Sequence, residues 1–229
     1  MTKLLPFLLA IGAGLVMWHV SVWRTRQELA RTSAPLRDRD LMIEIDKLAI
    51  ALDPPGIEVH VIDIEPVNGL ATPDGKVYIT RGFLDRVRAG QVTAPEIAGV
   101  VAHELGHVAL GHARRRMIEF SGQNALRIAL AAVLGRFLPG LGVWVANLLV
   151  TMLSAHLSRS DEFEADEFAA ALMVRAGLGV GPLVSLFHKL DHLSGMRGAP
   201  PVWLASHPPT TDRIAAIETL NRRWDSEQA

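Results

Sequence analysis

His103-Glu104-Leu105-Gly106-His107 is the stretch of sequence that decides the fold. It matches the pattern HExxH, which in a helix places two histidines about one turn apart, so that both imidazoles can reach one metal ion. The carboxylate of Glu104 then lies beside the open coordination position, where a general base for a metal-bound water belongs. The pattern predicts a hydrolytic zinc site with one ion per chain.

The residues before this stretch predict a buried helix. Thr93-Ala94-Pro95-Glu96 has the pattern of a capping box with proline in the first turn, and Ile97 to Ala102 is an apolar run. Burying a His-Glu-His cluster without a partner costs on the order of several kcal/mol. A metal ion is the simplest partner for these side chains.

Composition limits the choice of ligands and partners. The sequence contains no cysteine, so any zinc must be held by His, Asp or Glu. The formal net charge is -1, and without a surplus of basic residues we expect no nucleic-acid partner.

An apolar run from Leu4 to Trp23 has about the 20-residue length that crosses a bilayer, and it lacks a signal-peptide cleavage site. Residues 1–23 are therefore predicted to be an uncleaved transmembrane helix, a single-pass anchor in the cell (inner) membrane. The positive charges Arg24, Arg26 and Arg31 follow the run, whereas Lys3 precedes it. This weakly favours a cytoplasmic catalytic domain over a periplasmic one.

Residues 24–56 are predicted to form a linker helix that ends at a Pro-Pro-Gly break. Alternation over 57–64 and a second short run over 76–80 predict strands of a small sheet, and the rest of 57–229 is mostly helical. The expected fold class is α+β, mostly α, with the sheet beside the HExxH helix. An edge strand at 76–80 would suit an extended peptide.

A second apolar region, 125–157, lies between the HExxH stretch and the next acidic cluster. Two interpretations remain open: a helical hairpin that dips into the membrane, or helices that cover the active-site cleft. Either one returns the chain to the side on which it started.

The third ligand must come from downstream, because a catalytic zinc normally has three protein ligands. The dense carboxylate cluster is Ser158-Arg159-Ser160-Asp161-Glu162-Phe163-Glu164-Ala165-Asp166. Glu162 and Asp166 are four apart and share a helix face, so one can bind the metal while the other accepts a hydrogen bond from a ligand histidine.

With these motifs the chain resembles the M48 family of membrane-linked zinc metallopeptidases, which have a zincin-like fold. The resemblance rests on HELGH at 103–107, on the run from Ser158 to Asp166, and on Ser206-His207-Pro208-Pro209 followed by Arg213. It covers roughly residues 57–220.

The resemblance implies a role for each matching residue. His103, His107 and Glu162 would be the zinc ligands and Glu104 the catalytic base. Asp166 would support a ligand. The remaining two expected site residues are His207, which would stabilise the oxyanion or transiently occupy the metal, and Arg213, which would be a supporting charge or help to stabilise the oxyanion.

Other polar residues are expected outside the site. His60 is expected on a strand and His112 at the solvated end of the zinc helix. The run Arg114-Arg115-Arg116 is expected to be exposed, and His188 with His192 to lie on a surface helix.

The expected function is a membrane-anchored, zinc-dependent endopeptidase (metalloprotease) that hydrolyses peptide bonds of misfolded or membrane-proximal proteins in protein quality control. The alternative is a membrane-associated chaperone or assembly factor, either non-proteolytic or combining both activities. An intact Glu104 favours the protease, since a binding module needs no base.

Overall fold

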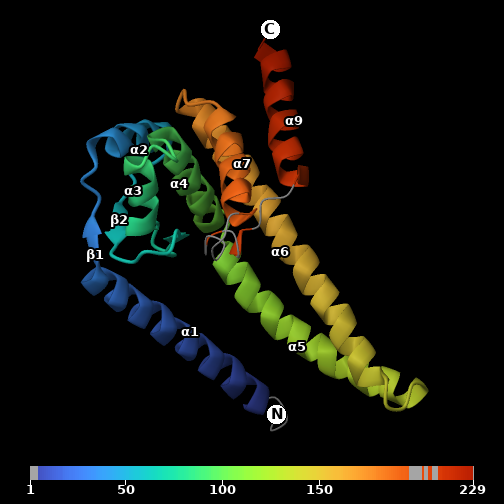
Figure 1. Cartoon of the computed structure of the whole chain (residues 1–229). Helices are drawn as coiled ribbons and strands as arrows, with labels where there is room; N and C mark the ends of the chain where they lie inside the picture. The colour runs from blue at the N-terminus through green and yellow to red at the C-terminus, as the bar shows by residue number, and fades with distance from the viewer. Residues whose placement is uncertain (1–4, 196–202, 204–205, 208–210, 229) are drawn as a thin grey trace.

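The computed structural model describes residues 5–195, 203, 206–207 and 211–228 (Figure 1). The elements in chain order are α1 (Leu5–Thr32), β1 (Ser33–Pro35), α2 (Arg39–Ala51), β2 (Val59–Ile62), β3 (Gly69–Ala71), β4 (Val77–Thr80), α3 (Arg81–Arg88), α4 (Ala94–Ala109), α5 (His112–Phe137), α6 (Gly142–Arg175), α7 (Gly181–Gly195) and α9 (Thr211–Gln228). The described part of the chain is mostly helical with one small sheet, which confirms the predicted fold class.

The sheet has the order β1-β2-β4-β3, in which β2 and β4 are parallel and both other pairs are antiparallel. Strands β2 and β4 lie within the predicted ranges 57–64 and 76–80, whereas β1 and β3 were not predicted. The prediction of an edge strand at 76–80 was wrong, because β4 lies between β2 and β3. Among the described strands, β3 is the edge beside α4, where a Cβ on Gly69 would meet the side chain of Val100.

Helix α4 begins with the predicted capping box of Thr93 and Glu96. Every residue from Glu96 to Gly106 is buried. One face packs on α2 and the sheet through Val100 and Val101, within a core that includes Leu41, Ile79, Met173 and Leu186. The HExxH stretch therefore occupies the centre of the molecule, where its side chains are held rigidly by packing.

The prediction of one linker helix over 24–56 was wrong, because the end of one helix, a strand and a second helix occupy this range. Helix α1 continues through residue 23 to Thr32, and strand β1 separates it from α2. Leu29, near the end of α1, packs on Ile62 and Tyr78 of the sheet. In the part of the chain that the structure describes, no helix combines the length and the apolar character needed to cross a bilayer.

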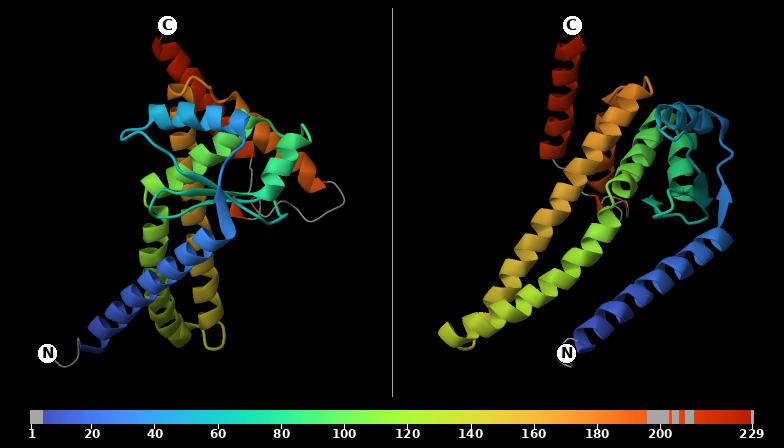
Figure 2. Two further views of the ribbon diagram at one scale, coloured as in Figure 1. Left: turned by 90° about the vertical axis from the view of Figure 1, so that its left-hand side faces the viewer. Right: turned by 180° about the vertical axis from the view of Figure 1, so that it is seen from behind.

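Helices α5 and α6 form a long antiparallel pair joined by a turn at residues 138–141. This arm and α1 project from the same end of the sheet-bearing body, and α9 extends from the opposite end (Figures 1 and 2). Large apolar side chains are exposed towards the tip of the arm, among them Ile128, Phe137, Leu141, Val143 and Trp144.

Candidate metal centre

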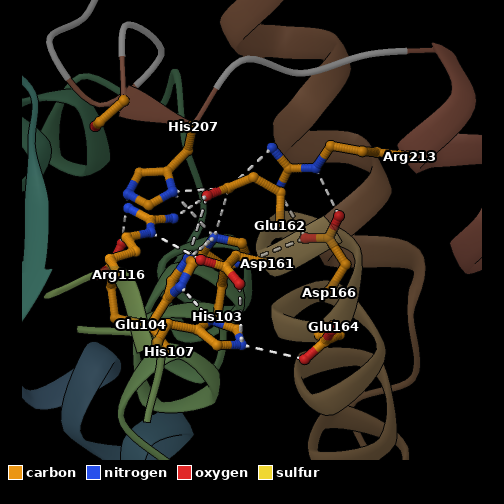
Figure 3. A network of polar contacts seen from close by, with 12 residues as sticks. His103, Glu104, His107, Arg116, Asp161, Glu162, Glu164, Asp166, His207 and Arg213 are labelled. Atoms are coloured by element: carbon orange, nitrogen blue, oxygen red, sulfur yellow. Dashed lines mark hydrogen bonds and ion pairs between the residues drawn. The ribbon is translucent and has the colours of Figure 1, made fainter. Parts of the chain in front are cut away.

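Four parts of the chain converge on one buried group of polar side chains (Figure 3). Helix α4 supplies His103, Glu104 and His107, α6 supplies Glu162 and Asp166, the segment after α7 supplies His207, and α9 supplies Arg213. All seven residues that the sequence predicted for the site are therefore brought together.

The three predicted ligands lie close enough together to share one ion. Nε2 of His103 lies 3.2 Å from Nε2 of His107. Oε2 of Glu162 lies 3.4 Å from Nε2 of His103, and Oε1 of the same carboxylate lies 3.5 Å from Nε2 of His107. A tetrahedral ion with bonds of about 2.0–2.1 Å separates its ligands by about 3.3–3.4 Å. The donors therefore fit a zinc ion in their chemistry, and one atom from each lies within 4.8 Å of the others, close enough to converge on one ion.

Gly106 allows this approach of α4 to α6. A Cβ at this position would lie 3.0 Å from the carbonyl oxygen of Ala165 and 3.1 Å from its Cα. The glycine inside the HELGH stretch thus lets the two ligand-bearing helices pack backbone to backbone, next to both His107 and Glu162.

The carboxylate of Asp166, which is itself paired with Arg213, contacts the second ring nitrogen of His103. Nδ1 of His103 lies 2.9 Å from Asp166, and Arg213 donates two hydrogen bonds, of 2.6 and 2.7 Å, to the same carboxylate. Burial opposes protonation of His103, but its contacts with Asp166 and Glu162 outweigh burial and raise the pKa of His103 to about 9. Burial also acts against the charged form of Asp166, yet the Arg213 guanidinium holds the pKa of that carboxyl below its usual value.

His107 has the opposite electrostatic setting. Burial, and then the positive charge of His103, lower the pKa of His107 to about 2. The pKa of Glu162 is far below its usual value, because its contacts with His103 and His207 outweigh burial. Without a metal, the directions of these shifts favour a proton on His103 over one on His107 or Glu162.

Glu104 and His207 face each other beside this group. Nε1 of Trp203 donates a 2.9 Å hydrogen bond to Oε1 of Glu104, and Nε2 of His207 lies 3.5 Å from the same oxygen. Sequence reasoning missed Trp203, which is fully buried. It lies in a Pro-rich and Gly-rich segment without periodicity, so no pattern in the sequence marks it.

His207 also belongs to the potential ligand group. Its Nδ1 lies 2.8 Å from Glu162 and 3.3 Å from Nε2 of His103. His103, His107, Glu162 and His207 form one set of donors that could hold a metal ion. Pro208 and Pro209, which completed the predicted motif, lie outside the described residues.

Arg213 lies on the far side of Asp166 from His103. Its side chain is buried and lies 3.3 Å from Glu162 and 4.8 Å from the centre of the Phe187 ring. It is not among the residues that line the cleft described below. This position favours a supporting charge over direct stabilisation of an oxyanion.

The expectation that His112 lies at a solvated helix end was wrong, whereas Arg114 and Arg116 are exposed as expected and Arg115 is half-buried. His112 is 1% exposed, and its Nδ1 lies 2.7 Å from Nδ1 of His107. Helix α4 ends at Ala109, and the left-handed Gly111 (φ 67°) turns the chain so that α5 begins with His112 against the site. Arg115 and Arg116 both pair with Asp161, and Arg116 also lies 3.5 Å from Glu162.

The other histidines lie elsewhere. His60 is on β2 against Tyr78 and Glu58, His188 is exposed on α7, and the side chain of His192 lies outside the described residues. Asp161 and Glu164, the neighbouring carboxylates of the same cluster, pair with Arg115.

A cleft of about 490 Å³ opens beside the metal centre. One wall is the segment from Asn68 to Ala71, which includes β3, and the other is the junction of α4 and α5. Glu104, His107 and His207 line it. An extended chain lying in this cleft would pass the predicted base and the metal.

Comparisons with known proteins agree with this geometry. The model of Peptidase family M48 matches residues 35–221. Metalloprotease YcaL of Escherichia coli is 34% identical over 151 residues, which cover 66% of this chain and 57% of YcaL. A protease HtpX homolog of Bordetella pertussis is 30% identical over 245 residues, covering 91% of this chain and 80% of the homolog. Human mitochondrial metalloendopeptidase OMA1 is 26% identical over 181 residues, covering 73% of this chain and 34% of OMA1.

Proposed function

This chain belongs to peptidase family M48, and on that premise we propose that it is a zinc-dependent endopeptidase with His103, His107 and Glu162 as ligands. Zinc is the cofactor, as the sequence predicted. The chain spans 57% of YcaL and 34% of OMA1, so its own activity is argued from its site. The observation that carries the proposal is the convergence of these three side chains, whose donor atoms lie 3.2 to 3.5 Å apart, beside a cleft that Glu104 lines.

Each residue of the cleft has a distinct task in this proposal. Bound zinc supplies Lewis acidity, which activates water and polarises the peptide carbonyl. Glu104 takes the proton from the attacking water and returns it to the leaving amine, and the hydrogen bond from Trp203 fixes its carboxylate for this transfer. His207, which lies next to the base, donates to the oxyanion.

His207 has a second task when the cleft is empty. Its Nδ1 lies as close to the ligand atoms of His103 and Glu162 as those atoms lie to each other. In this position it can take the fourth place on the metal until a substrate arrives. Both roles that the sequence left open for His207 are therefore compatible with one location.

The outer edge of β3, which pairs with no other described strand, is the substrate-binding element in this proposal. In the register of β3 with β4, Asn68 accepts a hydrogen bond from the backbone N–H of Thr80 and Thr72 donates one to the carbonyl of Lys76. Alternation then directs the backbone N–H and C=O of Ala71 away from β4. An extended peptide would pair with this edge, and its backbone rather than its side chains would supply most of the affinity.

Misfolded or membrane-proximal proteins are the proposed substrates, because they offer extended segments.

We propose that residues 1–23 anchor the chain in a membrane. The exposed apolar residues Leu15, Val16, Met17, Val20 and Trp23 of α1 support this, as does the arm of α5 and α6, which projects from the same end (Figure 2). The cytoplasmic side stays the favoured one, on the charge of Arg24 and Arg26.

Cleavage of casein by the purified full-length chain tests the proposal. We expect proteolysis that a zinc chelator abolishes and added zinc restores. A chaperone would instead suppress aggregation of casein with or without the chelator, while leaving the casein intact. That outcome would replace the protease with the alternative function.

A further inference from the structure

His112 makes the shortest contact to any of the three proposed ligands outside the ligand set itself. Its Nδ1 lies 2.7 Å from Nδ1 of His107, and the two rings meet nearly edge to face, with planes 74° apart. The contact joins the end of α4 to the first residue of α5 across the turn at Gly111. No requirement of chain connectivity brings the two ring nitrogens within hydrogen-bonding distance.

The proton positions in this pair follow from the metal site. His107 presents Nε2 to the other ligands, so its Nδ1 carries the proton and donates. Nδ1 of His112 must then accept, which places the proton of His112 on Nε2. Nε2 of His112 faces Glu164 at 3.4 Å and Asp161 at 3.9 Å, two carboxylates that can accept from it.

The two carboxylates that face His112 are themselves held by arginine side chains. Arg115 donates to both Asp161 and Glu164, and Arg116 donates to Asp161. A neutral imidazole can accept at one nitrogen while it donates at the other, whereas an imidazolium can only donate.

We infer that His112 is a positioning residue, which holds the zinc ligand His107 in one tautomer and one ring orientation through an Nδ1–Nδ1 hydrogen bond. The inference rests on the proposed role of His107 as a ligand. It makes the two ligand histidines of α4 unequal: His103 is backed by the carboxylate of Asp166, and His107 by a neutral imidazole. Hydrogen-bond partners of this kind orient ligands, and their loss commonly weakens metal binding by about 10–100-fold.

Zinc affinity of the full-length chain tests this inference, measured by competition with a chromogenic chelator. The variants are His112→Ala, which removes the acceptor, and His112→Asn, whose amide can accept from His107 and donate towards Glu164. His188→Ala, on an exposed helix face, is the matched control. We expect His112→Ala to bind zinc about 10–100-fold more weakly and His112→Asn to recover most of that loss, with the control unchanged.

The absorption spectrum of the cobalt-substituted protein gives a second readout. We expect altered ligand-field bands in His112→Ala and bands like those of the wild type in His112→Asn. If His112→Ala does not fold, His112→Phe, which fills the site without an acceptor, takes its place. The inference would be overturned if His112→Ala, or His112→Phe in its place, kept the affinity and spectrum of the wild type. It would also be overturned if His112→Asn bound zinc as weakly as the variant that lacks an acceptor.

His107→Ala separates this inference from the function on which it rests. If zinc binding is lost in His107→Ala but unchanged in the His112 variants, the metal site stands and the positioning role alone is wrong. If His107→Ala binds zinc as the wild type does, His107 is not a ligand and both are wrong.

Discussion

At the residue scale, the two proposed ligand histidines of α4 differ in pKa before a metal binds. His103 is held protonated by Asp166 and Glu162, with its pKa at about 9, and His107 is neutral, with its pKa at about 2. A zinc ion needs the lone pair on Nε2 of each ring. Loading the site therefore requires His103 to lose its proton.

We predict that zinc binding at pH 7–8 releases about one proton per site. Below the pKa of His103, each unit of acidification should weaken zinc binding by up to about tenfold, because the proton competes with the metal. Calorimetry in two buffers of different ionisation enthalpy measures the proton count. Binding without proton release in this pH range would show that His103 is neutral in the metal-free protein.

Arg213 is predicted to act on the metal through Asp166. Lysine cannot reproduce the two parallel hydrogen bonds to Asp166 together with the contact to Glu162. Arg213→Lys should therefore weaken zinc binding about 10–100-fold, as expected for a lost outer contact. Arg223→Lys, exposed on the same helix α9, is the control. Equal affinities in the two variants would mean that Arg213 serves only the stability of the fold.

At the element scale, the site depends on how closely α4 packs on α6. A methyl group at Gly106 would press on the backbone of Ala165, next to Glu162 and Asp166. Backbone cannot move aside as a flexible side chain can. The absence of a side chain at Gly106 thus allows the spacing of the proposed ligands.

Gly106→Ala is predicted to destabilise the fold by about 1–3 kcal/mol, the usual range for overpacking. Gly122→Ala is the matched control, because a Cβ there meets nothing within 4 Å and alanine favours the helix. Urea unfolding with and without zinc measures both. Gly106→Ala should also lose part of the stabilisation by zinc. A Gly106→Ala variant as stable as the control would show that the helices are not in tight contact.

Strand β3 carries a prediction about substrate. Ala71→Pro removes the outward N–H from the strand edge, whereas Ala71→Ser keeps it. We expect the proline variant to raise KM for peptide substrates about fivefold with zinc affinity unchanged, since one edge hydrogen bond contributes about 1 kcal/mol to binding. A KM like that of the serine variant would exclude pairing of the substrate at Ala71.

The sequence was informative where local signals agree. The capping box at Thr93 and the apolar run after it correctly predicted α4, and the spacing of Glu162 and Asp166 correctly placed both on one helix face. Strands β1 and β3 are three residues long, too short to show alternation. His112 was misplaced because the reversal at Gly111, which turns it onto His107, depends on tertiary packing and not on periodicity.

At the scale of the whole molecule, α1 and the arm of α5 and α6 share one end, and the metal centre lies where the arm meets the body (Figures 1 and 3). Asp161, Glu162 and Arg116 tie the base of the arm to the site. A membrane that held α1 and the arm would therefore lie to one side of the cleft. Substrates close to that membrane would be the first to reach it.

The anchor is tested by flotation with phospholipid vesicles. We predict that the full-length chain floats with the vesicles and that a chain lacking residues 1–23 does not. A second truncated chain with Phe137→Ser and Trp144→Ser at the exposed tip measures any contribution of the arm. If the chain lacking residues 1–23 still floats, and flotation is lost only when Phe137→Ser and Trp144→Ser are added, the arm binds the membrane instead.

The central claim is that Glu104 is the base of a zinc endopeptidase. Glu104→Gln preserves the shape of the side chain and an oxygen for Trp203, but it cannot take a proton. The most direct measurement is peptide cleavage by this variant, with its zinc content determined on the same sample. We predict one zinc per chain as in the wild type and a loss of kcat of about 10²–10⁴-fold, the usual contribution of a general base. Cleavage at the wild-type rate with zinc retained would contradict it.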